Sequence, residues 1–198
     1  AWLDAVRPGA WGRVEAAIDG GPTLALAFAT SGRWAKTLGR PPLTQYCGLN
    51  LGRDTGRLTA AEFDAVVALV DKLPAEPRIR LPLAGPIEAQ LPFRWAGFAV
   101  EAGFTYVIRP GARAKVSRTV RRHINGAARA LDVAWGHDLD ALDALSRATF
   151  ARQGIVRPFD RSLLERVLAV GRETGRIETV VARDAKGRSV AAILVVTD

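Results

Sequence analysis

The sequence has one cysteine, two histidines and no methionine among its 198 residues. A single cysteine excludes an internal disulfide, and so few cysteines and histidines speak against a structural zinc site. No apolar run reaches the roughly 18 residues that span a bilayer. The first residues also lack the basic region and apolar core of a secretory signal peptide. We therefore expect a cytoplasmic protein that binds no metal.

Basic residues outnumber acidic ones, 28 to 20, which gives a formal net charge of +8. This excess favours polyanionic partners: nucleic acid, anionic lipid or phosphorylated small molecules. The apolar content of 48% is ordinary for a globular protein, and the length allows one large or two small domains. Because methionine is absent even at position 1 and the last residues form a strand pattern, we expect the chain to be a piece of a longer protein.

A β-hairpin pattern occurs twice. The first copy, RVEAAIDGGPTLALAFATSG, runs from Arg13 to Gly32, and the second, RIETVVARDAKGRSVAAILVVTD, from Arg176 to Asp198. Each has an alternating apolar strand, a turn with Asp and Gly, and a nearly continuous apolar strand. Alternation indicates one buried face, and a continuous run indicates two. Two similar α/β units in tandem would explain the repeat, and the shared composition of hairpins is the alternative.

Strands and one helix make up the rest of the first half. LTQYCGLNL (43–51) and RIRLPLAG (78–85) predict strands, residues 86–97 have the composition of a loop, and residues 98–109 predict a strand or hairpin. Thr59 and Glu62 have the spacing of a capping box, which predicts the start of a helix. The apolar residues that follow share one helical face: Phe63, Val66, Val67, Val70 and Leu73.

The second half opens with a basic helix, from about Ala114 to Leu131. No acidic residue occurs between Glu101 and Asp132, and the apolar positions form one stripe: Val116, Val120, Ile124, Ala127 and Leu131. A strand (131–138), two helices capped by Asp138 and Asp160, and the second hairpin follow.

From Leu131 onward, the order strand, helix, helix, strand, strand resembles the opening of the GNAT acyltransferase fold. The strand–helix–strand order of the first half resembles the continuation of that fold. Several short strings also resemble, in the same order, those of the tandem BioF2-like and Fem-type (FemAB-like) GNAT proteins. They are PPLTQY (41–46), FRWAGF (93–98) with TYVI (105–108), RRHINGA (121–127) and FARQG (150–154).

The resemblance implies an α/β (α+β) fold of tandem GNAT-like units, each with a mixed central sheet flanked by helices. Residues 1–110 would form the first unit and residues 111–198 the start of a second, incomplete one. It also implies an N-acyltransferase that moves an acetyl or acyl group to an amine. Acetyl-CoA or another acyl-CoA would be the co-substrate, without metal, and the acceptor would be a polar, anionic small molecule, phosphorylated or part of the cell envelope.

Candidate substrate-binding residues follow from the same strings. Thr44, Gln45 and Tyr46 come after the rigid Pro41-Pro42 pair and would line the acceptor groove; alternatively they form the solvent side of an ordinary strand. The other candidates are two pairs that would bind a phosphate or the substrate or else occupy solvated helix positions: Arg121 with Arg122, and Arg152 with Gln153. No general base is assigned, and Cys47 is expected to be a small buried residue rather than a nucleophile.

The expected cofactor cradle departs from the family pattern. GNAT enzymes bind the acyl-CoA pyrophosphate through R/Q-x-x-G-x-G/A at a helix N-terminus, and this string is absent at the corresponding place in the first half. That place instead carries Gly52, Arg53, Gly56 and Arg57, which we take as weak cofactor-binding candidates.

Two alternatives stay open. A Fem-type transferase would take its aminoacyl group from tRNA, which suits a basic helix. A non-catalytic nucleic-acid-binding module built on residues 113–129 would show affinity that falls steeply with salt.

Overall fold

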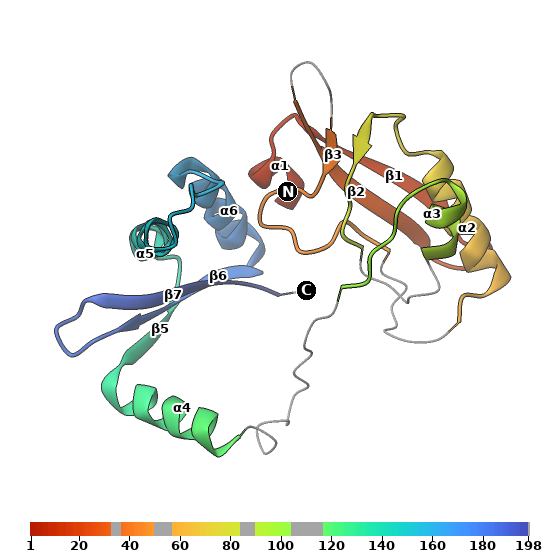
Figure 1. Cartoon of the computed structure of the whole chain (residues 1–198). Helices are drawn as coiled ribbons and strands as arrows, with labels where there is room; N and C mark the ends of the chain where they lie inside the picture. Colours follow the sequence, from red (N-terminus) through yellow and green to blue (C-terminus); the bar gives the residue numbers. More distant parts are fainter. Residues whose placement is uncertain (33–36, 50–56, 84–89, 104–116, 198) are drawn as a thin grey trace. The chain divides into compact units, whose positions relative to one another are not determined.

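The computed structural model describes residues 1–32, 37–49, 57–83, 90–103 and 117–197 (Figure 1). The chain divides into two compact units. Residues Val6–Phe104 are termed the N-terminal unit, and Ala1–Ala5 with Thr105–Asp198 the C-terminal unit. The predicted boundary after residue 110 falls outside the described residues and stays a prediction.

The N-terminal unit is built on a sheet with the strand order β1-β2-β3-β4. The strands β1 (Trp11–Ala17) and β2 (Thr23–Ser31) form the predicted antiparallel hairpin. The short strand β3 (Thr37–Gly39) pairs antiparallel with β2, whereas β4 (Arg78–Ile79) is parallel to β3. This sheet is therefore mixed.

Helix α2 (Ala60–Asp71) packs against β1 and β2. It begins at the predicted capping box: the Thr59 hydroxyl accepts from the Glu62 N–H at 3.2 Å, and the Glu62 carboxylate accepts from the Thr59 N–H at 2.7 Å. Helix α3 (Gln90–Trp95) packs beside α2, with the Trp95 and Phe63 rings edge to face. The core between helix and sheet includes Leu24, Leu26, Leu38, Val66 and Leu69, each at most 1% exposed.

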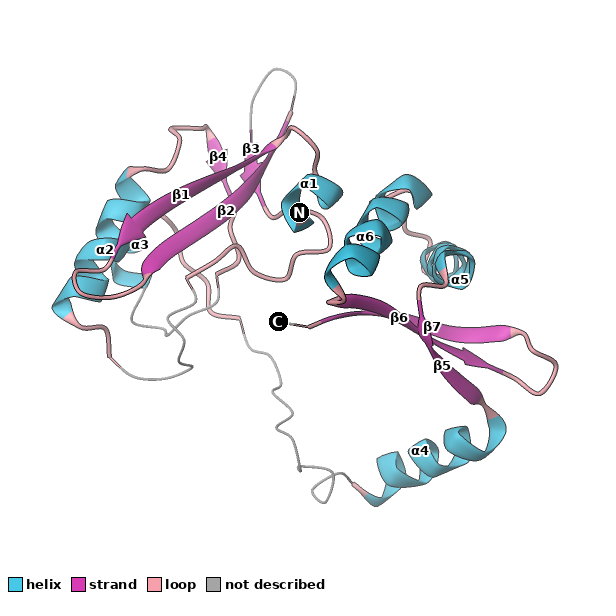
Figure 2. Cartoon of the chain, turned by 180° about the vertical axis from the view of Figure 1, so that it is seen from behind, coloured by secondary structure: helices cyan, strands magenta, loops and turns pink. Residues whose placement is uncertain are grey.

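The C-terminal unit contains an antiparallel sheet in the order β5-β6-β7. Its strands are β5 (Asp132–Gly136), β6 (Ile177–Arg183) and β7 (Ser189–Val196). Helices α5 (Leu139–Arg152) and α6 (Arg161–Thr174) lie on one face of this sheet (Figure 2) and begin at the predicted caps Asp138 and Asp160. The predicted order strand, helix, helix, strand, strand is therefore confirmed.

A buried charge network joins α5 to the segment before α6. Asp143 is fully buried, and its Oδ1 accepts a hydrogen bond from Nη1 of Arg157 at 2.7 Å. Arg147, one turn further along α5, pairs with the other carboxylate oxygen. Burial alone would raise the pKa of Asp143, but its hydrogen bonds to Arg157 and Arg147 outweigh this and hold the pKa below its usual value.

Helix α4 (Arg118–Ala130) is the described part of the predicted basic helix. It has no buried residue, so its apolar stripe is open: Val120 is 47% exposed and Ile124 40%. The short helix α1 (Trp2–Val6) contacts α6, because the Ala5 carbonyl oxygen accepts a hydrogen bond from Nε of Arg166 at 2.8 Å. Among the described helices, none has the length and apolar character needed to cross a membrane.

Several local predictions for the first half were wrong. No strand forms at 43–49, where one isolated bridge joins Gly48 to Leu26, and the predicted strand at 78–85 is reduced to β4 in its described part. The predicted loop 86–97 contains α3, and residues 98–103 are not a strand. The reason at 43–49 is Pro41 and Pro42, since proline has no N–H to continue a strand ladder.

A candidate anion-binding cavity

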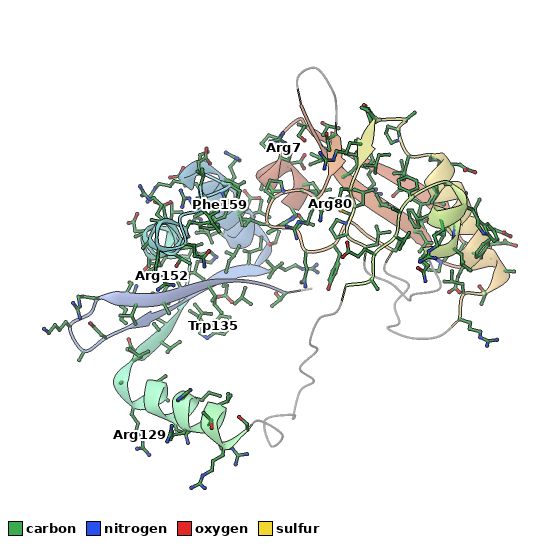
Figure 3. The ribbon with its side chains drawn as sticks, in the orientation of Figure 1. Arg7, Arg80, Arg129, Trp135, Arg152 and Phe159 are labelled. Atoms are coloured by element: carbon green, nitrogen blue, oxygen red, sulfur yellow. The ribbon has the colours of Figure 1, made fainter. Side chains whose placement is uncertain are left out.

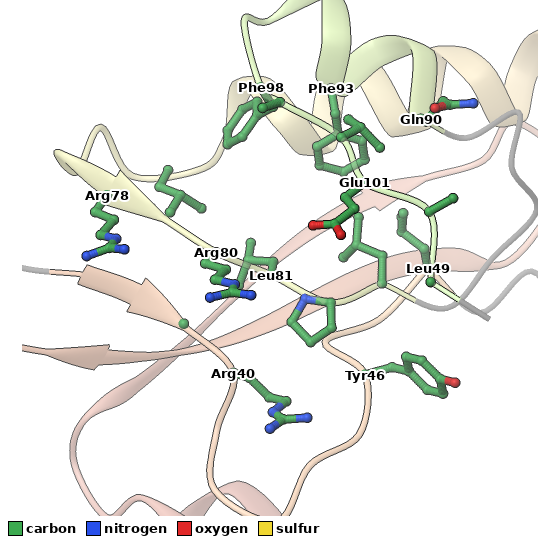
Figure 4. Close-up of a pocket in the computed structure, with 18 of the residues that line it drawn as sticks. Arg40, Tyr46, Leu49, Arg78, Arg80, Leu81, Gln90, Phe93, Phe98 and Glu101 are labelled. Atoms are coloured by element: carbon green, nitrogen blue, oxygen red, sulfur yellow. The ribbon is translucent and has the colours of Figure 1, made fainter. Parts of the chain in front are cut away.

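A cavity of about 1140 Å³ lies in the N-terminal unit beside the parallel pair β3 and β4 (Figure 4). Thr37 and Gly39 of β3 and Arg78 and Ile79 of β4 contribute to its wall. The rest of the lining comes from the segments that leave these two strands, from α3 and from residues 98–103 after it.

The cavity opens where the chain leaves the sheet and later rejoins it. The pairing of β3 and β4 ends with a hydrogen bond from the N–H of Arg80 to the carbonyl oxygen of Leu38 at 2.9 Å. Beyond Gly39, the segment from Arg40 to Tyr46 departs from the ladder. The chain returns at Cys47. The Cys47 N–H donates to the carbonyl oxygen of Pro82 at 2.8 Å, and the Cys47 carbonyl oxygen accepts from the N–H of Ala27 at 2.7 Å. Arg40 and Tyr46, the first and last residues of this excursion, both line the cavity.

Close packing of Gly48 on β2 fixes the return of the chain. Gly48 has a φ of +139°, and a Cβ at this position would overlap the carbonyl oxygen of Ala25, so only glycine fits. Leu43 and Leu49 also have positive φ values, 54° and 65°. Such a conformation costs about 1–2 kcal/mol for a residue with a side chain. Strained backbone of this kind is concentrated at functional sites.

Three arginines face the cavity. Arg40 begins the excursion, and Arg78 and Arg80 lie on the same side of the β4 segment because side chains two residues apart in a strand point the same way (Figure 4). All three are exposed, and within the described part of the chain none of them forms an ion pair. Guanidinium groups bind phosphate and carboxylate through paired N–H donors. The three together make this wall suitable for an anion.

The rest of the cavity lining is largely apolar. Its buried or half-buried members are Leu49, Leu81, Phe93 and Phe98, and the last two rings stack edge to face with centroids 5.9 Å apart. Glu101 adds a carboxylate, and Tyr46 a phenol. The cavity can therefore hold a molecule with an anionic group and an apolar portion.

Of the substrate-binding residues predicted in the first half, Tyr46 lines the cavity, whereas Thr44 and Gln45 do not. The Thr44 hydroxyl donates to the carbonyl oxygen of Pro42 at 3.2 Å, which shapes the excursion. Gln45 donates from Nε2 to the Tyr46 hydroxyl, also at 3.2 Å, and so orients the tyrosine. We therefore assign Thr44 and Gln45 supporting positions next to the cavity.

The two pairs of substrate-binding residues predicted in the second half both belong to the C-terminal unit, but each pair lies on a different helix. Arg121 and Arg122 are exposed on α4, where a shallow groove is lined by Arg118, Arg121, Arg122, Asn125, Gly126 and Arg129. Arg152 is the last residue of α5, and Gln153 caps that helix, both exposed to solvent. Figure 3 shows Arg129 on α4 and Arg152 at the end of α5. The structure does not bring the two pairs together.

The weak cofactor-binding candidates Gly52, Arg53 and Gly56 lie outside the described residues, and Arg57, before α2, is exposed.

Cys47 is buried, as expected. Burial raises the pKa of its thiol to about 11, although the positive charge of Arg40 opposes this shift. At neutral pH the thiolate needed for a nucleophile is therefore scarce. Among the described residues, no group of three or more potential metal ligands comes together.

Arg40, Arg78, Arg80 and Glu101 were missed by the sequence analysis. The string Arg78-Ile79-Arg80 does carry a signal, since alternation in a strand places two arginines on one face. Arg40 and Glu101 lie in irregular segments, and no local pattern relates either of them to β4.

Comparison of the chain with protein-family models, with curated proteins and with solved structures finds no match.

Proposed function

We propose that the protein is a GNAT-type N-acyltransferase of the tandem, FemAB-like kind, and that the cavity beside β3 and β4 binds its anionic acceptor. The observation that carries this proposal is that three exposed arginines, Arg40, Arg78 and Arg80, line the cavity together with apolar residues. A polar acceptor that carries a phosphate or a carboxylate fits this wall.

The topology of the N-terminal unit supports the proposal. The parallel strands β3 and β4 are connected through α2, with antiparallel strands on the other side of β3. The GNAT resemblance implies acyl-CoA binding where the strand meets the N-terminus of the helix in such a unit, and the cavity proposed for the acceptor lies beside the parallel pair of the same unit. The strand, helix, helix, strand, strand order of the C-terminal unit supports a second unit of the same kind.

In the proposed reaction, the acceptor amine attacks the thioester carbonyl of acetyl-CoA or another acyl-CoA. A C–N bond forms, the C–S bond breaks, and the amine's proton ends on the released thiol. The contribution of this chain would be positioning, because holding the two reactants together removes much of the entropic cost of their encounter. The arginine wall would fix the acceptor through its anionic group.

Calorimetric titration with acetyl-CoA at two salt concentrations tests the donor. Thiol release from acetyl-CoA in the presence of an amine that carries a phosphate ester then tests transfer. Saturable binding and amine-dependent thiol release are expected. If acetyl-CoA does not bind at either salt concentration, acyl-CoA is excluded as the donor, and an aminoacyl-tRNA donor is favoured.

A specific observation favours a second candidate, nucleic-acid binding by α4. The arginines Arg118, Arg122 and Arg129 lie on an exposed groove, and α4 contains no acidic residue. Phosphate contacts of this kind give an affinity that falls steeply with salt. Fluorescence anisotropy with a labelled RNA tests this candidate: Arg118→Gln with Arg122→Gln should reduce the salt slope, and an unchanged slope would exclude a role for α4.

A further inference from the structure

The cavity in the N-terminal unit contains one carboxylate among its three guanidinium groups. Glu101 comes from the segment after α3, whereas Arg40, Arg78 and Arg80 come from the β3–β4 side. In Figure 4 the Glu101 carboxylate and the Arg80 guanidinium point into the same part of the cavity. Within the described residues, Glu101 forms no ion pair with an arginine or any other side chain.

This arrangement is selective in its charge. A purely anionic ligand would be attracted by the arginines and repelled by Glu101. A ligand that also carries an ammonium group could donate a charge-assisted hydrogen bond from that group to the Glu101 carboxylate. Such a bond is stronger than one between neutral groups. The carboxylate would therefore favour ligands that carry the positive group over ligands of equal size that lack it.

We propose that the cavity binds zwitterionic ligands, with the anionic group on Arg40 and Arg80 and the ammonium group on Glu101. Glu101 is here a residue that positions the amine and selects for it. This inference rests on the proposed function in one respect, because it takes the cavity as the acceptor site. It adds which residue recognises the amine and what charge pattern the acceptor carries.

Two probes that differ mainly in the amine test the inference: O-phosphoethanolamine and ethyl phosphate. In calorimetric titrations we expect O-phosphoethanolamine to bind about tenfold more tightly, as one charge-assisted hydrogen bond allows. Glu101→Gln should bring the two affinities together and leave the binding of ethyl phosphate at least as strong. Arg80→Gln should weaken both probes, whereas Asp71→Asn, at an exposed carboxylate on α2, should change neither.

Equal affinities for the two probes, absence of binding by both, or a preference that survives Glu101→Gln would each overturn the inference. The outcome is separable from that of the proposed function. Selective binding without any acyl transfer would refute the acyltransferase and leave the zwitterion site standing. Thiol release from acetyl-CoA without selectivity between the probes would refute only the assignment of Glu101.

Discussion

The N–H of Cys47 donates to the carbonyl oxygen of Pro82 at 2.8 Å, and this bond rejoins the chain to the β4 side after the excursion that begins at Arg40. The pairing ends at Gly39 and resumes at Cys47, and residues on both sides of this break line the cavity. Two prolines, Pro41 and Pro42, account for the break since neither can donate to the ladder. The shape of the site therefore depends on how firmly the return of the chain is fixed.

Gly48→Ala should disrupt this return. The new methyl group would overlap the Ala25 carbonyl, and alanine is strained at a φ of +139°. We expect a loss of about 3 kcal/mol in the free energy of unfolding, a large effect for one substitution, measured by urea denaturation. Gly39→Ala is the matched control, since nothing lies within 4 Å of its added Cβ. Equal stability of the two variants would contradict the docking of Gly48 on β2.

Thr59→Ala should destabilise the N-terminal unit by removing the cap of α2. The hydroxyl of Thr59 satisfies the N–H of Glu62, and loss of such a cap costs about 1 kcal/mol. Urea denaturation should show this loss, whereas Thr59→Ser keeps the hydroxyl and should retain most of the stability. A neutral Thr59→Ala variant would show that the cap is not needed.

The sequence predicted those parts of the fold that depend on neighbouring residues. The hairpin of β1 and β2 follows from the turn at Asp19–Pro22, and α2 follows from Thr59 and Glu62. The prediction failed at Leu43–Leu49, where the apolar and polar residues suit a strand but the preceding prolines remove the chain from the ladder. Of the cavity, only Tyr46 was predicted, because the arginines and Glu101 meet through tertiary packing.

Asp143→Asn should destabilise the C-terminal unit strongly. The substitution leaves the guanidinium of Arg157, whose side chain is only 12% exposed, without its charged partner. Breaking a buried pair in this way costs about 3 kcal/mol or more. Asp140→Asn is the control, because Asp140 pairs with Arg161 in solvent, where a pair contributes about 1 kcal/mol at most. Thermal unfolding of the two variants compares them directly, and similar losses would refute a buried network.

Acid should destabilise the protein through the same carboxylate. The pKa of Asp143 is lower in the folded chain than its ordinary value of 3.8, so its contribution is complete above that value and is lost as the pH falls through the folded-state pKa. Urea midpoints measured between pH 7 and pH 2 should fall at the acid end, and less steeply in Asp143→Asn. A midpoint that rises on acidification would contradict the direction of this shift.

Cys47 should be inert in the folded protein. Its burial and a pKa raised to about 11 leave little accessible thiolate at pH 8. Ellman's reagent should react slowly with the native chain and rapidly once denaturant unfolds it. Fast labelling of the native chain would contradict the burial of Cys47.

The most direct test of the central claim is calorimetric titration with pyrophosphate, comparing the wild type with two double variants of equal charge change. Arg40→Gln with Arg80→Gln alters the cavity, and Arg118→Gln with Arg122→Gln alters the exposed groove on α4. The account predicts saturable binding by the wild type, about tenfold weaker binding by the cavity variant, and little change in the α4 variant. Absence of saturable binding by the wild type, or a loss confined to the α4 variant, would contradict an anion site beside β3 and β4.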